Sequence, residues 1–125
     1  MVRTMTSVLF VSAIALGANG VVADEALDSE MKTLAAHSGC GACHSIQSGQ
    51  PDTIPIGPAW SDVAARYAHE PGAEDNLVQA VLKGSNPYYS HWRGKVSGYA
   101  MPPNAVAISE GDARRLVQWI LALKK

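Results

Sequence analysis

The sequence predicts an all-α protein with three to four short helices joined by loops. Four segments carry apolar residues at the spacing of an amphipathic helix, and none shows the alternation of a strand. The length of 125 residues, with 47% hydrophobic residues, suits one globular domain. The formal net charge of −1 and the lack of a basic run argue against a nucleic-acid partner.

Residues 1–23 are predicted to be a secretory signal peptide that is cleaved. Arg3 provides a positive start, residues 7–16 are apolar, and Ala23 is a small residue suited to the cleavage point. An apolar stretch of ten residues is short for a membrane span, which needs about 20. The alternative is an uncleaved anchor or a buried helix. Cleavage would leave residues 24–125 as one domain in the periplasm, without stable membrane insertion.

The first two helices are predicted over residues 24–36 and 59–67. In the first, apolar residues recur at helical spacing up to Leu34, and Gly39 follows its end. The second directly follows Pro58, whose fixed φ suits the start of a helix.

The third and fourth helices are predicted over residues 74–83 and 110–123. Gly84 is placed to end the third, because glycine readily takes the conformation that closes a helix. Ser109 and Asp112 resemble a capping box at the start of the fourth, with Asp in place of the usual Glu.

Residues 40–44 read Cys-Gly-Ala-Cys-His, the C-x-x-C-H pattern of haem c attachment. Cys40 and Cys43 would each bond to a haem vinyl group, and His44 would ligate the iron. A thioredoxin-like redox pair needs a βαβ context, and a structural zinc site normally needs four ligands. A plain disulfide would leave His44 without a role. We therefore expect one covalently attached haem c per chain, which would also enlarge a modest core.

Met101 is the expected second iron ligand. Haem iron in an electron carrier usually has two protein ligands, either His and Met or His and His. Met101 lies in the long loop of residues 85–108, where Pro102 and Pro103 stiffen the chain after it. His91, in the same loop, is the main rival.

Three other potential ligands are less suited to the iron. Met31 precedes Cys40 on the predicted first helix and is expected in the core. His37 is too close to Cys40 to reach the other face of a haem, and His69 lies in a stretch expected to be exposed.

Taken in order along the chain, these motifs resemble the class I cytochromes c, in particular the short bacterial branch of periplasmic electron carriers. The resemblance covers nearly all of residues 24–125, and it implies the cytochrome c fold, with helices wrapped around one covalently attached haem. The matching segments are Cys40-Gly41-Ala42-Cys43-His44, Ile56-Gly57-Pro58-Ala59-Trp60, Lys83-Gly84-Ser85, Met101-Pro102-Pro103-Asn104 and the last helix with Trp119.

The resemblance also implies roles for three further residues. The Pro58 carbonyl would accept a hydrogen bond from the ring of His44, and the Asn104 amide would bond to the sulfur of the distal Met. From its place in the loop alone, Asn104 could instead clamp the loop. Trp92 would contact a haem propionate. Residues 86–98 are longer than the matching stretch of the family, so simple packing over the haem is the preferred explanation for their aromatic side chains.

Two filled axial positions predict a one-electron carrier without catalytic residues, because no position on the iron remains for a substrate. Redox proteins would dock briefly at the exposed haem edge. One alternative is the cytochrome subunit of a periplasmic sulfite, thiosulfate or alcohol dehydrogenase, docked through residues 86–98. Another is an enzyme or gas sensor with five-coordinate haem, which requires that Met101 does not bind the iron. The chain would accordingly be a monomer or a small subunit of a dehydrogenase.

Overall fold

A computed structural model describes residues 19–49 and 51–123, and the predicted signal peptide lies largely outside them. Its helices are α1 (Asn19–His37), α2 (Trp60–Tyr67), α3 (Ala73–Lys83) and α4 (Glu110–Leu121), with a short 3-10 helix, η1, at Cys40–Ala42. Within the described residues there is no strand, so the all-α prediction is confirmed. None of these helices is long and apolar enough to cross a membrane.

The helices differ from the predicted ranges mainly at their ends. α1 begins at Asn19, five residues before the predicted start, because no proline precedes Asp24 to stop the helix from extending in the intact chain. α4 ends at Leu121 rather than at residue 123. There, the backbone N–H of Ala122 donates to three carbonyls of the preceding turn, which closes the helix early.

Two predicted end signals are present. The Ser109 hydroxyl accepts from the Asp112 backbone N–H at 3.1 Å and donates to its carboxylate at 2.9 Å, so Ser109 caps α4. Gly84 follows α3 with φ of 85°. A side chain rarely adopts that conformation, which explains why glycine ends this helix.

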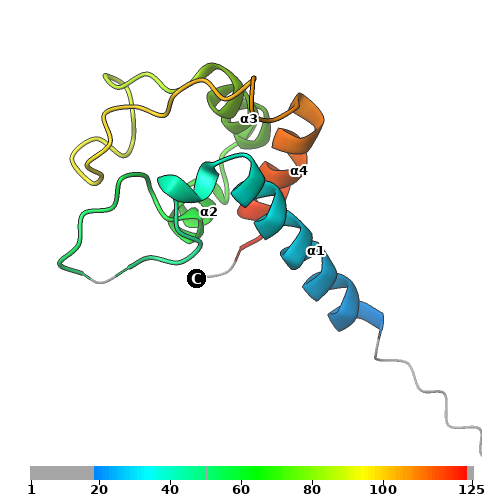
Figure 1. The fold of residues 1–125 in the computed structure, drawn as a ribbon. Coiled ribbons are helices and arrows are strands. Elements are labelled where there is room, and N and C mark those ends of the chain that lie inside the picture. The colour runs from blue at the N-terminus through cyan, green and yellow to red at the C-terminus, as the bar shows by residue number, and fades with distance from the viewer. Residues whose placement is uncertain (1–18, 50, 124–125) are drawn as a thin grey trace, which may run out of the picture.

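α4 is the central helix of the fold, since it packs against α1, α2 and α3 (Figure 1). The residues buried around it include Met31, Val78 and Leu116, and Met31 is a core residue as expected. Trp119 packs edge to face on Trp60 of α2, with ring centroids 5.7 Å apart. This edge-to-face contact joins α2 to α4 within the core.

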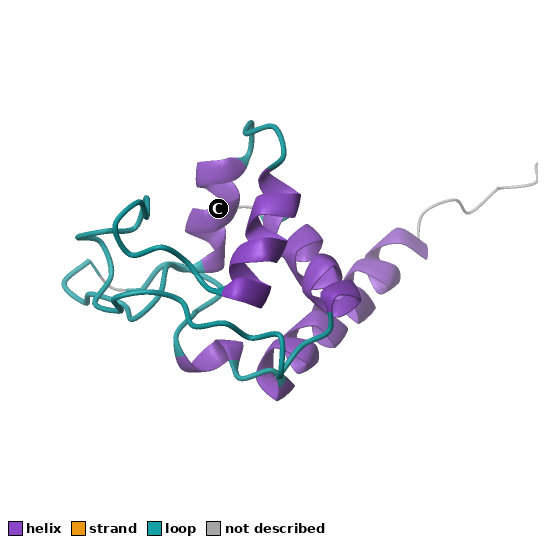
Figure 2. Cartoon of the chain, turned by 90° about the horizontal axis from the view of Figure 1, so that it is seen from above, coloured by secondary structure: helices purple, strands orange, loops and turns teal. Residues whose placement is uncertain are grey.

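Two long loops lie on the side of the helices away from the start of α1 (Figure 2). One joins η1 to α2 and the other joins α3 to α4. They are tied together by three hydrogen bonds among the described residues: the Ser97 N–H and hydroxyl both donate to the Pro55 carbonyl, and the Gly98 N–H donates to the Ile56 carbonyl. This pairing fixes the distance between the loops and leaves a hollow between them and the helices.

Ser61 on α2 offers a test of the packing. Its hydroxyl is buried and has no hydrogen-bond partner among the described residues. Ser61→Ala is therefore expected to raise the free energy of unfolding by about 1 kcal/mol, because it removes an unsatisfied buried group. Chemical denaturation measures this, with Ser109→Ala as the matched control, expected to lower stability by about 1 kcal/mol through loss of its cap. A loss in Ser61→Ala as large as in the control would show that the hydroxyl has a stabilising partner.

Candidate cofactor site

A cavity of about 530 Å³ lies between the helices and the two long loops. Its size falls within the roughly 300–1,000 Å³ typical of ligand and cofactor sites. All the site residues predicted from the sequence line it except Asn104: Cys40, Cys43, His44, Pro58, Trp92 and Met101. Leu77 and Val81 on α3 are only half-buried because they face this cavity.

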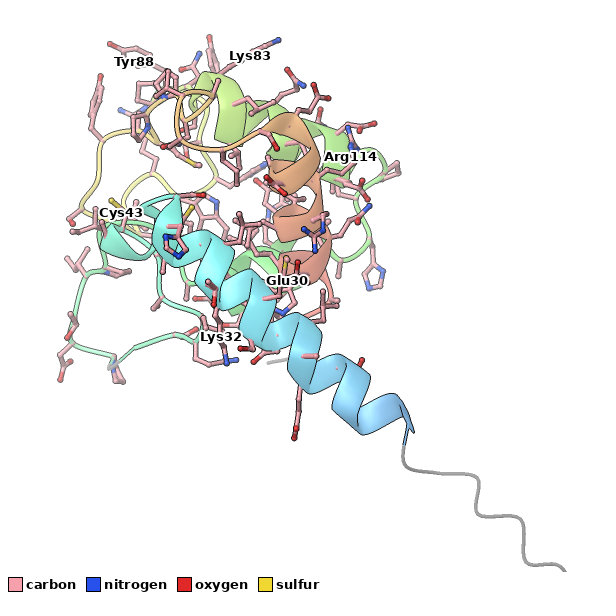
Figure 3. The ribbon with its side chains drawn as sticks, turned by 45° about the vertical axis from the view of Figure 1, so that its right-hand side comes forward. Glu30, Lys32, Cys43, Lys83, Tyr88 and Arg114 are labelled. Carbon is pink, nitrogen blue, oxygen red and sulfur yellow. The ribbon has the colours of Figure 1, made fainter. Side chains whose placement is uncertain are left out.

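The Cys40–His44 segment places both thiols and the imidazole on a single turn after α1. Figure 3 shows Cys43 beyond the end of this helix. The N–H groups of Cys43 and His44 both donate to the Cys40 carbonyl, at 3.2 and 3.1 Å. Both cysteines are free thiols. Partial burial raises the pKa of the Cys40 thiol, whereas a redox-active C-x-x-C pair requires a lowered thiol pKa. The described residues also form no βαβ unit, so the fold speaks against a thioredoxin-like pair.

The His44 ring is held by two contacts. Its Nδ1 lies 2.8 Å from the Pro58 carbonyl oxygen, and its ring stacks on Trp60 with centroids 5.9 Å apart. Since a carbonyl only accepts, Nδ1 must carry the proton, which leaves the lone pair on Nε2 for a metal. The contact with Pro58 implied by the family resemblance is therefore present, and its effect on an iron ligand stays a prediction.

Gly57 allows the loop to pass close beneath this ring. A Cβ at this position would lie 2.9 Å from Cε1 of His44 and 3.0 Å from the Cys43 carbonyl oxygen. The same carbonyl accepts a hydrogen bond from the Gly57 N–H at 2.8 Å. Any larger residue would push the His44 ring out of its position.

Asn104 clamps the loop that carries Met101. Its side-chain amide donates to the Pro102 carbonyl at 2.7 Å and to the Val81 carbonyl at 3.3 Å. Both amide hydrogens are thereby used, so the structure gives no hydrogen bond from Asn104 to the Met101 sulfur. Of the two roles considered for Asn104, the loop clamp is the one seen.

Trp92 lines the cavity and is half-buried there. The Lys95 ammonium lies 5.9 Å from the centre of the Trp92 ring. Burial raises the pKa of Tyr67, which lines the same cavity, and its interaction with Trp92 opposes the effect. The contact of Trp92 with a haem propionate stays a prediction. Tyr67 also lines the cavity, although the sequence did not single it out. The one indication in the sequence was its place on the same predicted helix as Trp60.

His91, the rival ligand, is exposed and held by other groups. Arg66 Nη2 lies 3.1 Å from both ring nitrogens of His91, and the ring meets Tyr67 edge to face at 5.8 Å. An arginine only donates, so one His91 nitrogen is occupied as its acceptor. Arg66 is itself fixed by an ion pair with Glu70 at 3.1 Å. These contacts hold His91 at the rim of the cavity.

The residues of this cavity fit a haem c. The donor set combines two free thiols, an imidazole whose Nε2 is available and a thioether, all facing one largely apolar hollow. The sequence profile of the Cytochrome c family matches residues 29–124. The chain belongs to the cytochrome c family. Its cofactor is accordingly a covalently attached haem c, and it is an electron-transfer protein rather than an enzyme.

Several proteins are similar to this cytochrome c over most of its length. Cytochrome c-551 of Pseudomonas aeruginosa is 37% identical over 109 residues, which span 87% of this chain and 91% of that protein. Cytochrome c-552 of Hydrogenobacter thermophilus is 35% identical over 91 residues, 73% of this chain and 79% of its own. The crystal structure of Nitrosomonas europaea cytochrome c552 superposes with a TM-score of 0.57 at 37% identity, covering 74% of this chain and 99% of that one.

Proposed function

We propose that this cytochrome c carries single electrons between redox proteins in the periplasm, with His44 and Met101 as the axial ligands of its iron. The observation that supports this most is that both side chains line one cavity next to two free thiols. When bound, haem c supplies an iron that changes its oxidation state by one electron. The thioether of Met101 would favour the reduced state.

The other residues of the cavity would serve this role by holding the ligands and excluding water. Pro58 would fix the tautomer and orientation of His44, and Trp60 would support the ring from within the core. Asn104 would hold the Met101 loop against α3. Trp92 would close the cavity by packing, with Tyr67 as its partner.

The location in the periplasm depends on the N-terminal segment. Residues 1–23 have the charged start, short apolar stretch and small residue of a cleaved export signal. The free thiols would then meet haem only after export, and the remaining domain would have no apolar segment of membrane length. The intact mass of the purified holoprotein would report both cleavage and the addition of one haem.

The charge distribution suggests the kind of redox partner. Residues 76–109 contain Lys83, Arg93 and Lys95 and no acidic residue, whereas residues 24–75 contain nine acidic and two basic residues. Lys83 extends from the end of α3 at the same edge of the molecule as Tyr88, remote from Glu30 on α1 (Figure 3). We call residues 76–109 the basic edge, and a partner with an acidic docking face would be attracted to it.

This idea predicts how the reduced holoprotein reacts with small oxidants. Hexacyanoferrate(III), an anion, is expected to react faster at low salt and to slow as salt is added, because ions screen its attraction to the basic edge. Replacement of Lys83, Arg93 and Lys95 by Ala should abolish most of this salt dependence. Lys32→Ala, on α1, is the matched control and should leave it unchanged. Equal salt dependence in all three proteins would contradict a basic docking edge.

A second candidate is the cytochrome subunit of a periplasmic dehydrogenase for sulfite, thiosulfate or an alcohol. The exposed tyrosines Tyr88, Tyr89 and Tyr99 favour it, since 67%, 86% and 74% of their surface is accessible and tyrosine is enriched at protein interfaces. Size-exclusion chromatography of a native periplasmic extract separates the two. A free carrier elutes near its own mass, and a subunit elutes with the larger enzyme.

A further inference from the structure

The segment that carries Met101 has few ways to be held in place. Pro102 and Pro103 have no backbone N–H, so between Met101 and Asn104 only the two end residues can donate. Both of these N–H groups reach the C-terminal end of α3. Met101 N–H donates to the Ser85 hydroxyl at 2.9 Å, and Asn104 N–H donates to the Val81 carbonyl at 3.0 Å.

Ser85 is bound to Met101 by two hydrogen bonds. Besides accepting from the Met101 N–H, it donates its own backbone N–H to the Met101 carbonyl at 2.9 Å. Both residues are half-buried and line the cavity. Every polar backbone group of Met101 is therefore paired with one residue, and its side chain is left free to face the cofactor.

Gly84 makes this close pairing possible. Its φ of 85° turns the chain directly after α3, and a Cβ at this position would lie 2.8 Å from the Met101 carbonyl oxygen. Only glycine allows the two segments to approach so closely. The pairing of Ser85 with Met101 is thus built into the way that α3 ends.

We propose that Ser85 is a positioning residue that holds Met101 on the haem iron. The inference rests on the proposed role of Met101 as the axial ligand. A thioether is a weak, uncharged ligand, so the fraction of time it spends on the iron depends on how much freedom its backbone has when it is released. Ser85 reduces that freedom, which lowers the cost of ordering the loop each time the ligand binds.

The test uses exogenous imidazole, which competes with a weak axial ligand in the oxidised holoprotein. Ser85→Ala removes the hydroxyl and keeps the second hydrogen bond. Its imidazole affinity should rise roughly two- to twelve-fold, the factor that corresponds to the net contribution of one hydrogen bond. Ser85→Thr retains the hydroxyl and should bind imidazole as the unmodified protein does. Ser109→Ala loses a similar hydroxyl contact far from the cavity, and should also leave the affinity unchanged.

The outcomes separate this inference from the proposed function. If Met101→Ala tightens imidazole binding and Ser85→Ala does not, Met101 is the ligand and Ser85 does not position it. If imidazole binding tightens equally in Ser85→Ala and Ser109→Ala, the effect comes from a general loss of stability and the inference is overturned. The inference is also overturned if Ser85→Thr binds imidazole as Ser85→Ala does. If Met101→Ala leaves the affinity unchanged, the proposed ligand itself is wrong.

Discussion

Replacing Met101 with Ala is expected to lower the reduction potential on the order of 0.1 V, within the roughly 0.8 V range that axial ligands control. The thioether favours the reduced iron, so its loss favours the oxidised state. For a one-electron couple, where about 59 mV is tenfold, this shift changes the redox equilibrium roughly fifty-fold. Spectroscopic redox titration of the purified holoprotein measures it.

His91→Ala is the matched control for this experiment. His91 is occupied by Arg66 at the cavity rim, so its removal should leave the potential nearly unchanged. The opposite pattern, with an unchanged potential in Met101→Ala and a shifted one in His91→Ala, would assign the second ligand to His91.

Cys40→Ala or Cys43→Ala is expected to prevent stable holoprotein. Each change removes one of the two thiols that would hold the cofactor, and without the cofactor an apolar cavity of about 530 Å³ stays at the centre of a small domain. Without the cofactor its apolar lining would be exposed to water, which is unfavourable. The pyridine haemochrome assay, combined with intact mass, measures covalent haem per chain.

Ser45→Ala, two residues after Cys43, controls for a change in the same loop. Its hydroxyl bonds only to the nearby Gln47 carbonyl at 2.8 Å in the structure, so normal haem content is expected. Normal amounts of covalent haem in either cysteine variant would argue against attachment at both positions.

Local signals in the sequence predicted the helices well. Ser109 caps α4 and Gly84 ends α3, because each acts through its own backbone and nearest neighbours. The early start of α1 at Asn19 was missed because the prediction began the mature chain at Asp24. The motif at Cys40–His44 placed three cavity residues together, since its spacing is short enough to fix their arrangement.

Contacts between distant segments were harder to predict. The hydrogen bond from Asn104 to Val81 and the packing of Trp119 on Trp60 depend on how α3 and α4 meet their neighbours. The Ser85 pair with Met101 was not foreseen at all, although Ser85 stands in a segment that resembles the family. Periodicity and spacing describe one segment at a time and carry no information on these partners.

The central claim is a haem iron with both axial positions filled by the protein. The absorption spectrum of the oxidised holoprotein tests it most directly, because a bond between Met sulfur and Fe(III) gives a weak near-infrared band. We expect this band in the unmodified protein and expect it to be lost in Met101→Ala. We also expect carbon monoxide to bind the reduced protein poorly at neutral pH. A missing band together with ready binding of carbon monoxide would contradict the account and favour a five-coordinate haem.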